Sequence, residues 1–276
     1  MDSLVDEPDL SDLRSAPWGP LGRGVVIAAV ATFGRFVMTV MNTTRVVNES
    51  SAHDAIMARP RDVGLVTVSN HTSTFDDPGV ISILAPGKYF LQEYFHGGTR
   101  WSVCAEDICF RNEFLRQFFL TGKTLPITRG GGVSQPVLQG VSQFVQQGEW
   151  LHIFPEGYVG TTGNLRPLKW GIGKIICDAV KETGGEPMVL PIYHSGMEQV
   201  MPRKARFPRW GNEVRVVVGR PLDLSGLTCN CGKEGTEQQA WKDITEHIRR
   251  ALMELQDGEA QNGARTFVNG GASNGE

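Results

Sequence analysis

The sequence predicts an α/β domain preceded by a hydrophobic segment that associates with a membrane. Three observations lead to this fold class. Short apolar runs rich in β-branched residues alternate with amphipathic stretches at helical spacing. Charged side chains follow several of these runs directly, where open α/β sheets bind their ligands. A nearly continuous apolar run lies ahead of the first expected strand.

Composition limits the class of protein. The chain has 276 residues, of which 40% are hydrophobic and 21% charged, with a net charge of −3. It is long enough for one large domain or two small ones, and its charge predicts no nucleic-acid partner. Cys104 and Cys109 are spaced C-x4-C, and Cys229 and Cys231 are spaced C-x-C. Neither spacing fits a zinc site, and the odd total of five predicts reduced thiols and no metal.

The N-terminal segment has three interpretations. Residues 1–22 form an acidic leader that we expect to be disordered and that lacks the Arg-rich composition of a mitochondrial presequence. The apolar run 25–41 is shorter than the roughly 20 residues that a spanning helix needs, and Arg35 near its middle would cost about 2.5 kcal/mol or more. We prefer a monotopic anchor over residues 23–42, with Arg23 and Arg35 snorkelling to head groups. A spanning helix and a buried core helix are the alternatives.

The first expected strand, residues 63–69, ends just before His71. Asp76 follows five residues later, and Pro78 favours the start of a helix there. A neutral imidazole accepts a proton near pH 7, and a carboxylate on its other nitrogen fixes the tautomer. This is a base with an orienting group. The alternative is a histidine that caps a helix beside the carboxylates Asp76 and Asp77.

Further elements follow at regular intervals. We expect strands at 101–105, 122–129, 150–154, 188–193 and 213–219, and helices at 113–120, 135–147, 168–182 and from 236. Arg129 ends one strand before three glycines, which suits a phosphate and equally a flexible loop. Glu156 and Gly157 follow another strand, where a tight turn is the alternative. Pro191 places the strand 188–193 at an edge, an end or a bulge.

The candidate residues at the strand ends fall into four blocks. These are residues 70–76 (NHTSTFD), 122–129 (GKTLPITR), 154–157 (FPEG) and 189–192 (VLPI). In this order they resemble the glycerolipid acyltransferase superfamily, whose members carry H-x4-D. Within it, the chain is most similar to the tafazzins over roughly residues 20–222, through residues 76–78 (DDP), 105–110 (AEDICF), 152–157 (HIFPEG), 169–173 (KWGIG) and 190–197 (LPIYHSGM).

The resemblance implies a fold, an activity and a location. It implies a single acyltransferase domain over 43–256, with a mixed, partly parallel sheet flanked by helices and a membrane-facing groove; we expect residues 257–276 to be a disordered tail. It implies acyl transfer to a lysophospholipid without a bound cofactor. Tafazzins move acyl chains between phospholipids without coenzyme A and remodel cardiolipin on mitochondrial membranes. Some relatives instead use acyl-CoA on lysophosphatidylethanolamine-type acceptors, and the endoplasmic reticulum or another internal membrane is the alternative location.

The resemblance also assigns the reaction. The lipid hydroxyl is the nucleophile, His71 removes its proton and Asp76 orients His71, so no protein nucleophile is needed. Ser73 is expected to be a turn residue. The oxyanion donor is expected in the backbone near residues 130–132 or Gly157. A soluble hydrolase is disfavoured because the chain has no G-x-S-x-G elbow.

Three further residues are assigned to substrate binding. Arg129 would hold the acceptor phosphate, because a fork of donors fits phosphate oxygens. Glu156 would fix an acceptor hydroxyl or the charged environment around Arg129. Pro191 would shape the wall of the groove. A lipid-binding or scaffold protein with an inactive site is the rival from another class. The intact site residues argue against it; they are His71, Asp76, Arg129 and Glu156.

Overall fold

The computed structural model describes residues 13–92, 97–160 and 164–270. Seven strands form one sheet in the order β1-β7-β6-β2-β5-β3-β4. The strands are β1 Thr43–Val47, β2 Leu65–Ser69, β3 Trp101–Ala105, β4 Thr124–Ile127, β5 Trp150–Ile153, β6 Met188–Ser195 and β7 Glu213–Val218. All neighbours run parallel except β6 and β7, which are antiparallel. The predicted α/β class with a mixed, partly parallel sheet is confirmed, and most of the strand pairs are parallel.

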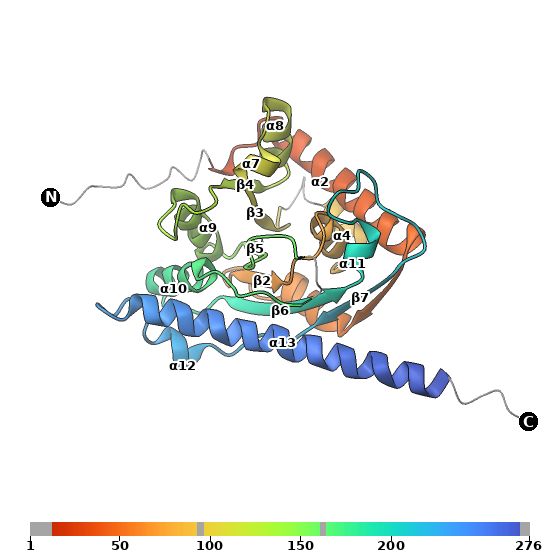
Figure 1. Ribbon diagram of the computed structural model, residues 1–276. Coiled ribbons are helices and arrows are strands. Elements are labelled where there is room, and N and C mark those ends of the chain that lie inside the picture. The colour runs from red at the N-terminus through yellow and green to blue at the C-terminus, as the bar shows by residue number, and fades with distance from the viewer. Residues whose placement is uncertain (1–12, 93–96, 161–163, 271–276) are drawn as a thin grey trace, which may run out of the picture.

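Helices cover both faces of this sheet (Figure 1). The α-helices are α2 Gly19–Phe36, α3 Glu49–His53, α4 Asp76–Ile83, α5 Gly87–Leu91, α7 Glu106–Cys109, α8 Glu113–Thr121, α9 Pro136–Gln146, α10 Gly171–Thr183, α11 Met197–Val200, α12 Ser225–Thr228 and α13 Glu237–Gly270. The π-helical turns η1 Val37–Met41 and η2 Asp54–Ala58 follow α2 and α3. Strands β2, β6 and β5 are central, so their carboxyl ends lie side by side.

The core has one layer on each face of the sheet. Along β2, Leu65 packs with α2 and α4 on one face, while Val66 and Val68 pack with α9, α10 and α13 on the other. This alternation is what a strand with a two-residue side-chain period gives between two helical layers. Both layers are needed to bury β2, whose five residues are all buried.

Two features of the sheet differ from the sequence-based expectation. Residues 43–47 form the edge strand β1, parallel to β7, ahead of the run 63–69 that was expected to be the first strand; TTRVV is short and three of its five residues are polar, so it lacks the apolar run of a buried strand. Pro191 lies in an interior strand rather than at an edge. Its carbonyl accepts from the Gly219 N–H at 2.8 Å, just past the end of β7, so the missing proline N–H faces a place where the ladder has stopped.

The N-terminal helix packs on the domain. Within the described residues, Gly19–Met41 is the one helix long and apolar enough to cross a membrane, and 33% of its most apolar window is buried. Arg35 Nη1 donates to the carbonyls of Ser82 and Ala85 at 2.9 and 3.0 Å. Arg23 Nε donates to the Thr121 carbonyl at 3.2 Å. The prediction that both arginines snorkel to head groups is therefore wrong, because main-chain carbonyls satisfy them.

The two ends of the chain also differ from the expected boundaries. Residues 1–12 of the leader lie outside the described residues, but Arg14 bonds to Glu149 and Gln147, and α2 already begins at Gly19. At the other end, α13 continues from residue 257 to Gly270, where a disordered tail was expected. The segment 257–270 contains no proline and several good helix formers, so nothing stops the helix at 257.

The cysteines form two disulfides rather than reduced thiols. Cys104 at the end of β3 pairs with Cys109 in α7, and Cys177 in α10 pairs with Cys231 after α12. Cys229 is free and exposed. The second pair joins positions 54 residues apart, which no local spacing in the sequence reveals.

Candidate active site

His71 and Asp76 meet at the carboxyl end of β2. The His71 Nδ1 atom lies 2.9 Å from Asp76 Oδ2. Asp76 is fully buried, whereas the His71 side chain is 19% exposed. The pair is brought together within one turn, because the chain leaves β2 at Ser69 and enters α4 at Asp76.

The tautomer of His71 follows from its partner. Asp76 Oδ2 also accepts the main-chain N–H groups of Thr72 and Ser73, at 2.7 and 2.9 Å. A carboxylate that accepts these bonds is an acceptor only, so His71 Nδ1 carries the proton and donates it to Asp76. Nε2 is then the lone-pair nitrogen, and none of the described residues bonds to it. The arrangement is that of a general base with its orienting carboxylate.

Contacts to the ring face and to the main chain hold His71 in place. It stacks on Phe154 with the ring centroids 4.2 Å apart and an interplanar angle of 16°. The His71 N–H donates to Glu156 Oε1 at 2.8 Å, and the His71 carbonyl accepts from the Gly160 N–H at 2.6 Å. Strands β2 and β5 are parallel neighbours in the sheet. The loop after β5 therefore fixes the turn after β2.

Glu156 has both carboxyl oxygens engaged by the main chain. Its Oε2 accepts from the Arg166 N–H at 3.1 Å, in addition to the bond from His71 to Oε1. Burial raises the pKa of the Glu156 carboxyl, while the two main-chain hydrogen bonds lower it to a smaller extent. This geometry ties two loops together and leaves Glu156 less free to bind an acceptor hydroxyl. Gly157 follows with a φ of 73°, which makes the sharp turn after β5.

Ser73 is a turn residue, as the sequence predicts. Its Oγ donates to the Met201 carbonyl at 2.8 Å and accepts from the Phe75 N–H at 3.1 Å. Neither partner is a base that activates a nucleophile. The hydroxyl links the His71 turn to the start of the loop that follows α11.

Arg129 lies at a more exposed position than the dyad. Its Nη1 donates to Asp107 Oδ2 at 2.9 Å, and its guanidinium lies 5.0 Å from the centre of the Tyr158 ring. The Arg166 guanidinium lies 5.6 Å from the same ring. Two cations thus flank Tyr158, two residues after Glu156. The sequence indicated only Arg129, because Arg166 lies outside any strand end.

Pro191 is not brought to the dyad. It pairs in register with Val68 and lies beside Gly219. The strand alternation places its side chain on the opposite face of the sheet from His194, three residues further on. His194 is the residue of β6 that reaches the site.

His194 and Asn70 form a buried network under the dyad. The His194 Nε2 atom lies 2.9 Å from the Asn70 carbonyl oxygen and 3.6 Å from Asp76 Oδ2. The Asn70 side chain accepts from the His194 N–H at 2.9 Å and donates to the His194 carbonyl at 2.8 Å. Since the Asn70 carbonyl is an acceptor, His194 Nε2 carries the proton. His194 follows a predicted strand, which was the one available signal for its role.

Two other polar groups near the site have structural partners. Burial lowers the pKa of His152 to about 3, so this ring is neutral and bonds to Thr67 at 2.8 Å. Asp77, next to Asp76, pairs with Arg100 at 2.5 Å. Neither group competes with His71 as a base.

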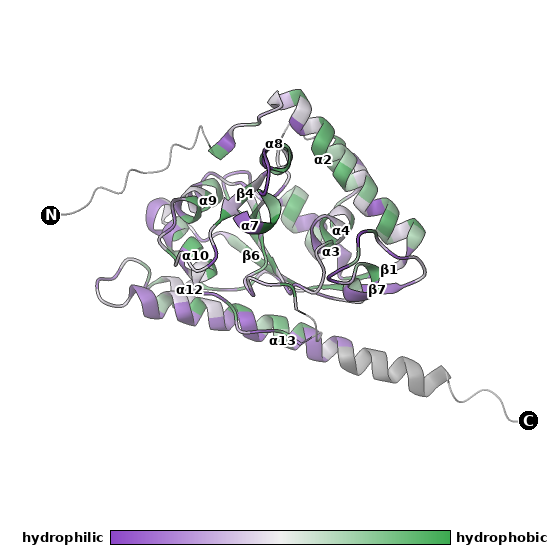
Figure 2. Ribbon diagram, turned by 45° about the horizontal axis from the view of Figure 1, so that its top comes forward, coloured by the Kyte–Doolittle hydropathy of each residue, from purple (hydrophilic) through white to green (hydrophobic). Residues whose placement is uncertain are grey.

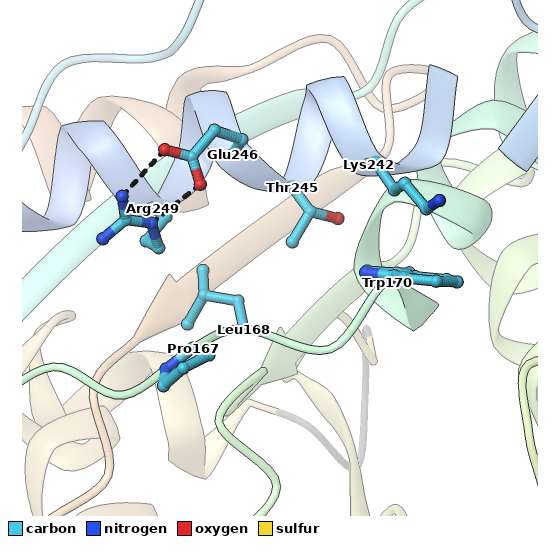
Figure 3. Close-up of a pocket in the computed structure, with 7 residues that line it drawn as sticks. All are labelled: Pro167, Leu168, Trp170, Lys242, Thr245, Glu246 and Arg249. Atoms are coloured by element: carbon cyan, nitrogen blue, oxygen red, sulfur yellow. Dashed lines mark hydrogen bonds and ion pairs between the residues drawn. The ribbon is translucent and has the colours of Figure 1, made fainter. Parts of the chain in front are cut away.

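The surface hollow in Figure 3 lies away from this site. It is lined by Pro167, Leu168, Trp170, Lys242, Thr245, Glu246 and Arg249, on α13 and the segment before α10. Glu246 and Arg249 bond to each other there, and none of the predicted site residues lines it. Among the described residues, no group of three or more His, Cys, Asp or Glu side chains has the geometry of a metal site.

Comparison with known proteins gives consistent relatives. The family model described as acyltransferase matches residues 48–195. A tafazzin from Drosophila melanogaster is 38% identical over 232 residues, covering 83% of this chain and 59% of the fly protein. An N-acylphosphatidylethanolamine synthase from Arabidopsis thaliana is 39% identical over 218 residues, covering 76% of this chain and 74% of the plant protein.

The fold has a solved counterpart. The crystal structure of the 1-acyl-sn-glycerophosphate acyltransferase PlsC from Thermotoga maritima superposes with a TM-score of 0.57 and 17% identity, covering 86% of this chain and 81% of that one. At this identity the likeness concerns the fold. The family match spans more than half of the chain and includes both members of the H-x4-D pair. A base with its orienting carboxylate at a strand end, within that match, is the arrangement of an acyl-transferring enzyme, and the chain belongs to the acyltransferase family.

Proposed function

We propose that this enzyme transfers a fatty acyl chain to the hydroxyl of a lysophospholipid, with a phospholipid as the donor, as in the remodelling of cardiolipin on mitochondrial membranes. The observation that supports this most is the His71–Asp76 pair, in which Nδ1 is held by a buried carboxylate and Nε2 is open. The tafazzin relatives support the choice of donor and of lipid.

The reaction then runs in two steps. His71 Nε2 takes the proton of the acceptor hydroxyl while its oxygen forms a bond to the acyl carbonyl carbon. Asp76 stabilises the imidazolium that results. The tetrahedral intermediate collapses, the ester bond to the donor glycerol oxygen breaks, and His71 returns the proton to that oxygen. A lysophospholipid leaves, and no proton or electron remains unaccounted for.

Two cations are suited to the phosphate of the acceptor. Arg129 and Arg166 both lie beside the ring of Tyr158. Tyr158 itself follows Glu156 by two residues. Guanidinium groups bind phosphate oxygens with paired N–H donors. Glu156 acts in this proposal through the main chain of His71 and Arg166, and Pro191 acts through the packing of β6.

Helix α2 is the element suited to hold the enzyme at a lipid surface. Part of it is buried in the domain and part is exposed, which fits an anchor in one leaflet better than a free spanning helix. The mitochondrial membrane is the proposed location because of the tafazzin relatives, and the endoplasmic reticulum is the alternative.

Two other reactions use the same base. Acyl-CoA as the donor, with a lysophosphatidylethanolamine-type acceptor, is the first. Acylation of the amine of phosphatidylethanolamine is the second, since a relative at 39% identity is named for that product. In both, His71 would remove a proton from the attacking group.

The test uses purified protein with radiolabelled lysophospholipid and either phospholipid or acyl-CoA as the sole donor. We expect label in diacyl phospholipid with the phospholipid donor, and none with the His71→Ala variant. Replacing the radiolabelled lysophospholipid by radiolabelled phosphatidylethanolamine tests the amine as the acceptor. Transfer from acyl-CoA alone, or N-acylated product alone, would replace the proposed reaction by one of the two others.

A further inference from the structure

The outer face of α2 continues onto a loop from a distant part of the sequence. Along α2 and η1, Val25, Phe36 and Val40 are 60%, 43% and 61% exposed. The loop of residues 202–211, between α11 and β7, lies beside the C-terminal half of α2 in both views (Figures 1 and 2). It carries Phe207 and Trp210, which are 79% and 65% exposed.

The loop contacts α2 and η1 at two points. The Trp210 ring meets Phe36 edge to face, with the centroids 6.3 Å apart. The Gly211 N–H donates to the Met41 carbonyl at 2.9 Å. The Trp210 ring is therefore held at an exposed position by defined contacts, and Phe207, three residues before it, is also exposed, although burial would be favourable for both rings. An exposed apolar surface kept in this way marks an interaction site.

The loop is also strongly basic. Its four cations, all exposed, are Arg203, Lys204, Arg206 and Arg209. None of them forms an ion pair with any residue in the part of the chain that the structure describes. Cations interleaved with aromatic rings fit the head-group region of an anionic bilayer, where the rings enter the interface and the charges meet phosphates.

We propose that loop 202–211 is a second membrane-contacting element, which docks on an anionic phospholipid surface beside α2. The inference rests on the proposed function in that it takes the enzyme to work on a lipid surface. A lipid surface is favoured over a protein partner because the apolar face of α2 and the basic loop are continuous, so one flat surface covers both.

This contact leads directly to the proposed base. Met201, at the start of the loop, accepts a hydrogen bond from Ser73 Oγ at 2.8 Å. On the other side, Phe33 of α2 packs edge to face on Phe75, with the centroids 5.9 Å apart. Both proposed membrane-contacting elements are thus linked by contacts to the turn that carries His71. Docking of the loop therefore holds the His71 turn, through Ser73, close to the lipid surface.

The test measures the position of Trp210 directly, because α2 alone could hold the protein on vesicles. Fluorescence is recorded for the full-length protein and for Trp210→Phe, on vesicles with and without brominated acyl chains. The difference between the two proteins gives the Trp210 signal. We expect brominated lipids to quench most of it on vesicles that contain an anionic phospholipid. A Trp210 signal that brominated lipids leave unchanged would overturn the proposal.

Charge is tested with matched triple variants. The loop variant is Arg203→Gln/Lys204→Gln/Arg206→Gln, and the control, with three exposed cations away from the loop, is Arg220→Gln/Lys233→Gln/Arg250→Gln. At low salt, we expect quenching of Trp210 in the loop variant to need a higher lipid concentration, by about fivefold for each cation removed. The control should match the parent, and the difference should vanish near 1 M salt, where the Debye length is about 3 Å. Equal titrations for both triples would refute the role of charge.

Acyl transfer in detergent micelles separates this inference from the proposed function. We expect the loop variant to transfer acyl chains at the parent rate in micelles and more slowly on anionic vesicles. A parent protein that transfers nothing in micelles would contradict the proposed function and leave the quenching result standing. A loop variant that matches the parent on vesicles and in quenching would refute the role of the loop cations in the membrane contact.

Discussion

Replacing Asp76 with Asn is the most informative single change to the proposed base. Asp76 Oδ2 accepts from the main-chain N–H groups of Thr72 and Ser73 as well as from His71 Nδ1. In the variant, the N–H groups of Thr72 and Ser73 still need an acceptor, so the Asn oxygen takes the position of Asp76 Oδ2. His71 Nδ1–H therefore still meets an oxygen, and the tautomer with Nε2 unprotonated is kept. What is lost is the negative charge.

The size of the effect follows from that charge. A buried carboxylate in contact with the imidazolium contributes on the order of 4 kcal/mol at an effective dielectric constant of 20 and a charge separation near 4 Å. We expect kcat to fall about a thousandfold, since about 1.4 kcal/mol corresponds to a factor of ten in rate. The KM for the acceptor should change little, because Asp76 does not touch it. Asp76→Ala removes the oxygen too and should lower kcat further.

The stability of the variant provides a second measurement. Asp76 Oδ1 is buried and has no hydrogen-bond partner among the described residues. The amide NH2 of Asn takes this place, and an unsatisfied buried donor costs about 1–3 kcal/mol. The free energy of unfolding, from urea titration, should fall by that amount while circular dichroism is unchanged. Rates of Asp76→Asn within about threefold of the parent, or equal to those of Asp76→Ala, would refute the assignment of charge and orientation to this carboxylate.

Four further changes test other parts of the structure. His194→Ala removes a ring that lies 3.6 Å from Asp76, and kcat should fall by up to about a hundredfold at unchanged KM, with partial recovery in His194→Gln, which keeps an N–H donor. Arg129→Ala should raise the KM for the lysophospholipid about tenfold or more, with a smaller change in kcat; an unchanged KM would make the residue structural. Burial holds the pKa of His152 at about 3, below its unfolded value near 6.5. Between these two pKa values the unfolded chain binds one proton more than the folded chain does. The contribution of neutral His152 to the free energy of unfolding is therefore complete above pH 6.5 and falls by about 1.4 kcal/mol per pH unit as the pH drops towards 3. In urea titrations at different pH values, His152→Gln should lose this pH dependence of the free energy of unfolding. Deleting residues 1–42 should leave an aggregated or partly unfolded protein by circular dichroism and size-exclusion chromatography, because the deletion removes part of the core.

The dyad could be predicted because its information is local. A β-branched run identifies β2, and the spacing of His71 and Asp76 places both within the turn that follows it. The positions of Glu156 and Arg129 at strand ends were predicted for the same reason. Their hydrogen bonds were not, because Glu156 bonds to main-chain groups that only the neighbouring loop supplies.

The buried network under the dyad could not be predicted in the same way. Asn70 and His194 lie 124 positions apart in the sequence and meet because β2 and β6 are neighbours in the sheet. Strand order is a property of the whole chain, and a single sequence shows it only through the pattern of connections. The Cys177–Cys231 disulfide and the edge position of β1 depend on the same long-range pairing.

The hydrophobic segment illustrates a limit of composition as a guide. A core and a bilayer accept the same apolar side chains, so the run 25–41 fits either. In the structure, the helical segment 19–41 has one face in the core and one face at the surface. Ile27 and Val37 lie in the core, while Val25 is 60% exposed. Arg35 was counted against a spanning helix; in the structure, the carbonyls at the end of α4 accept its hydrogen bonds. Since α4 begins at Asp76, the contact of α2 with the end of α4 also helps to position the carboxylate that orients the base.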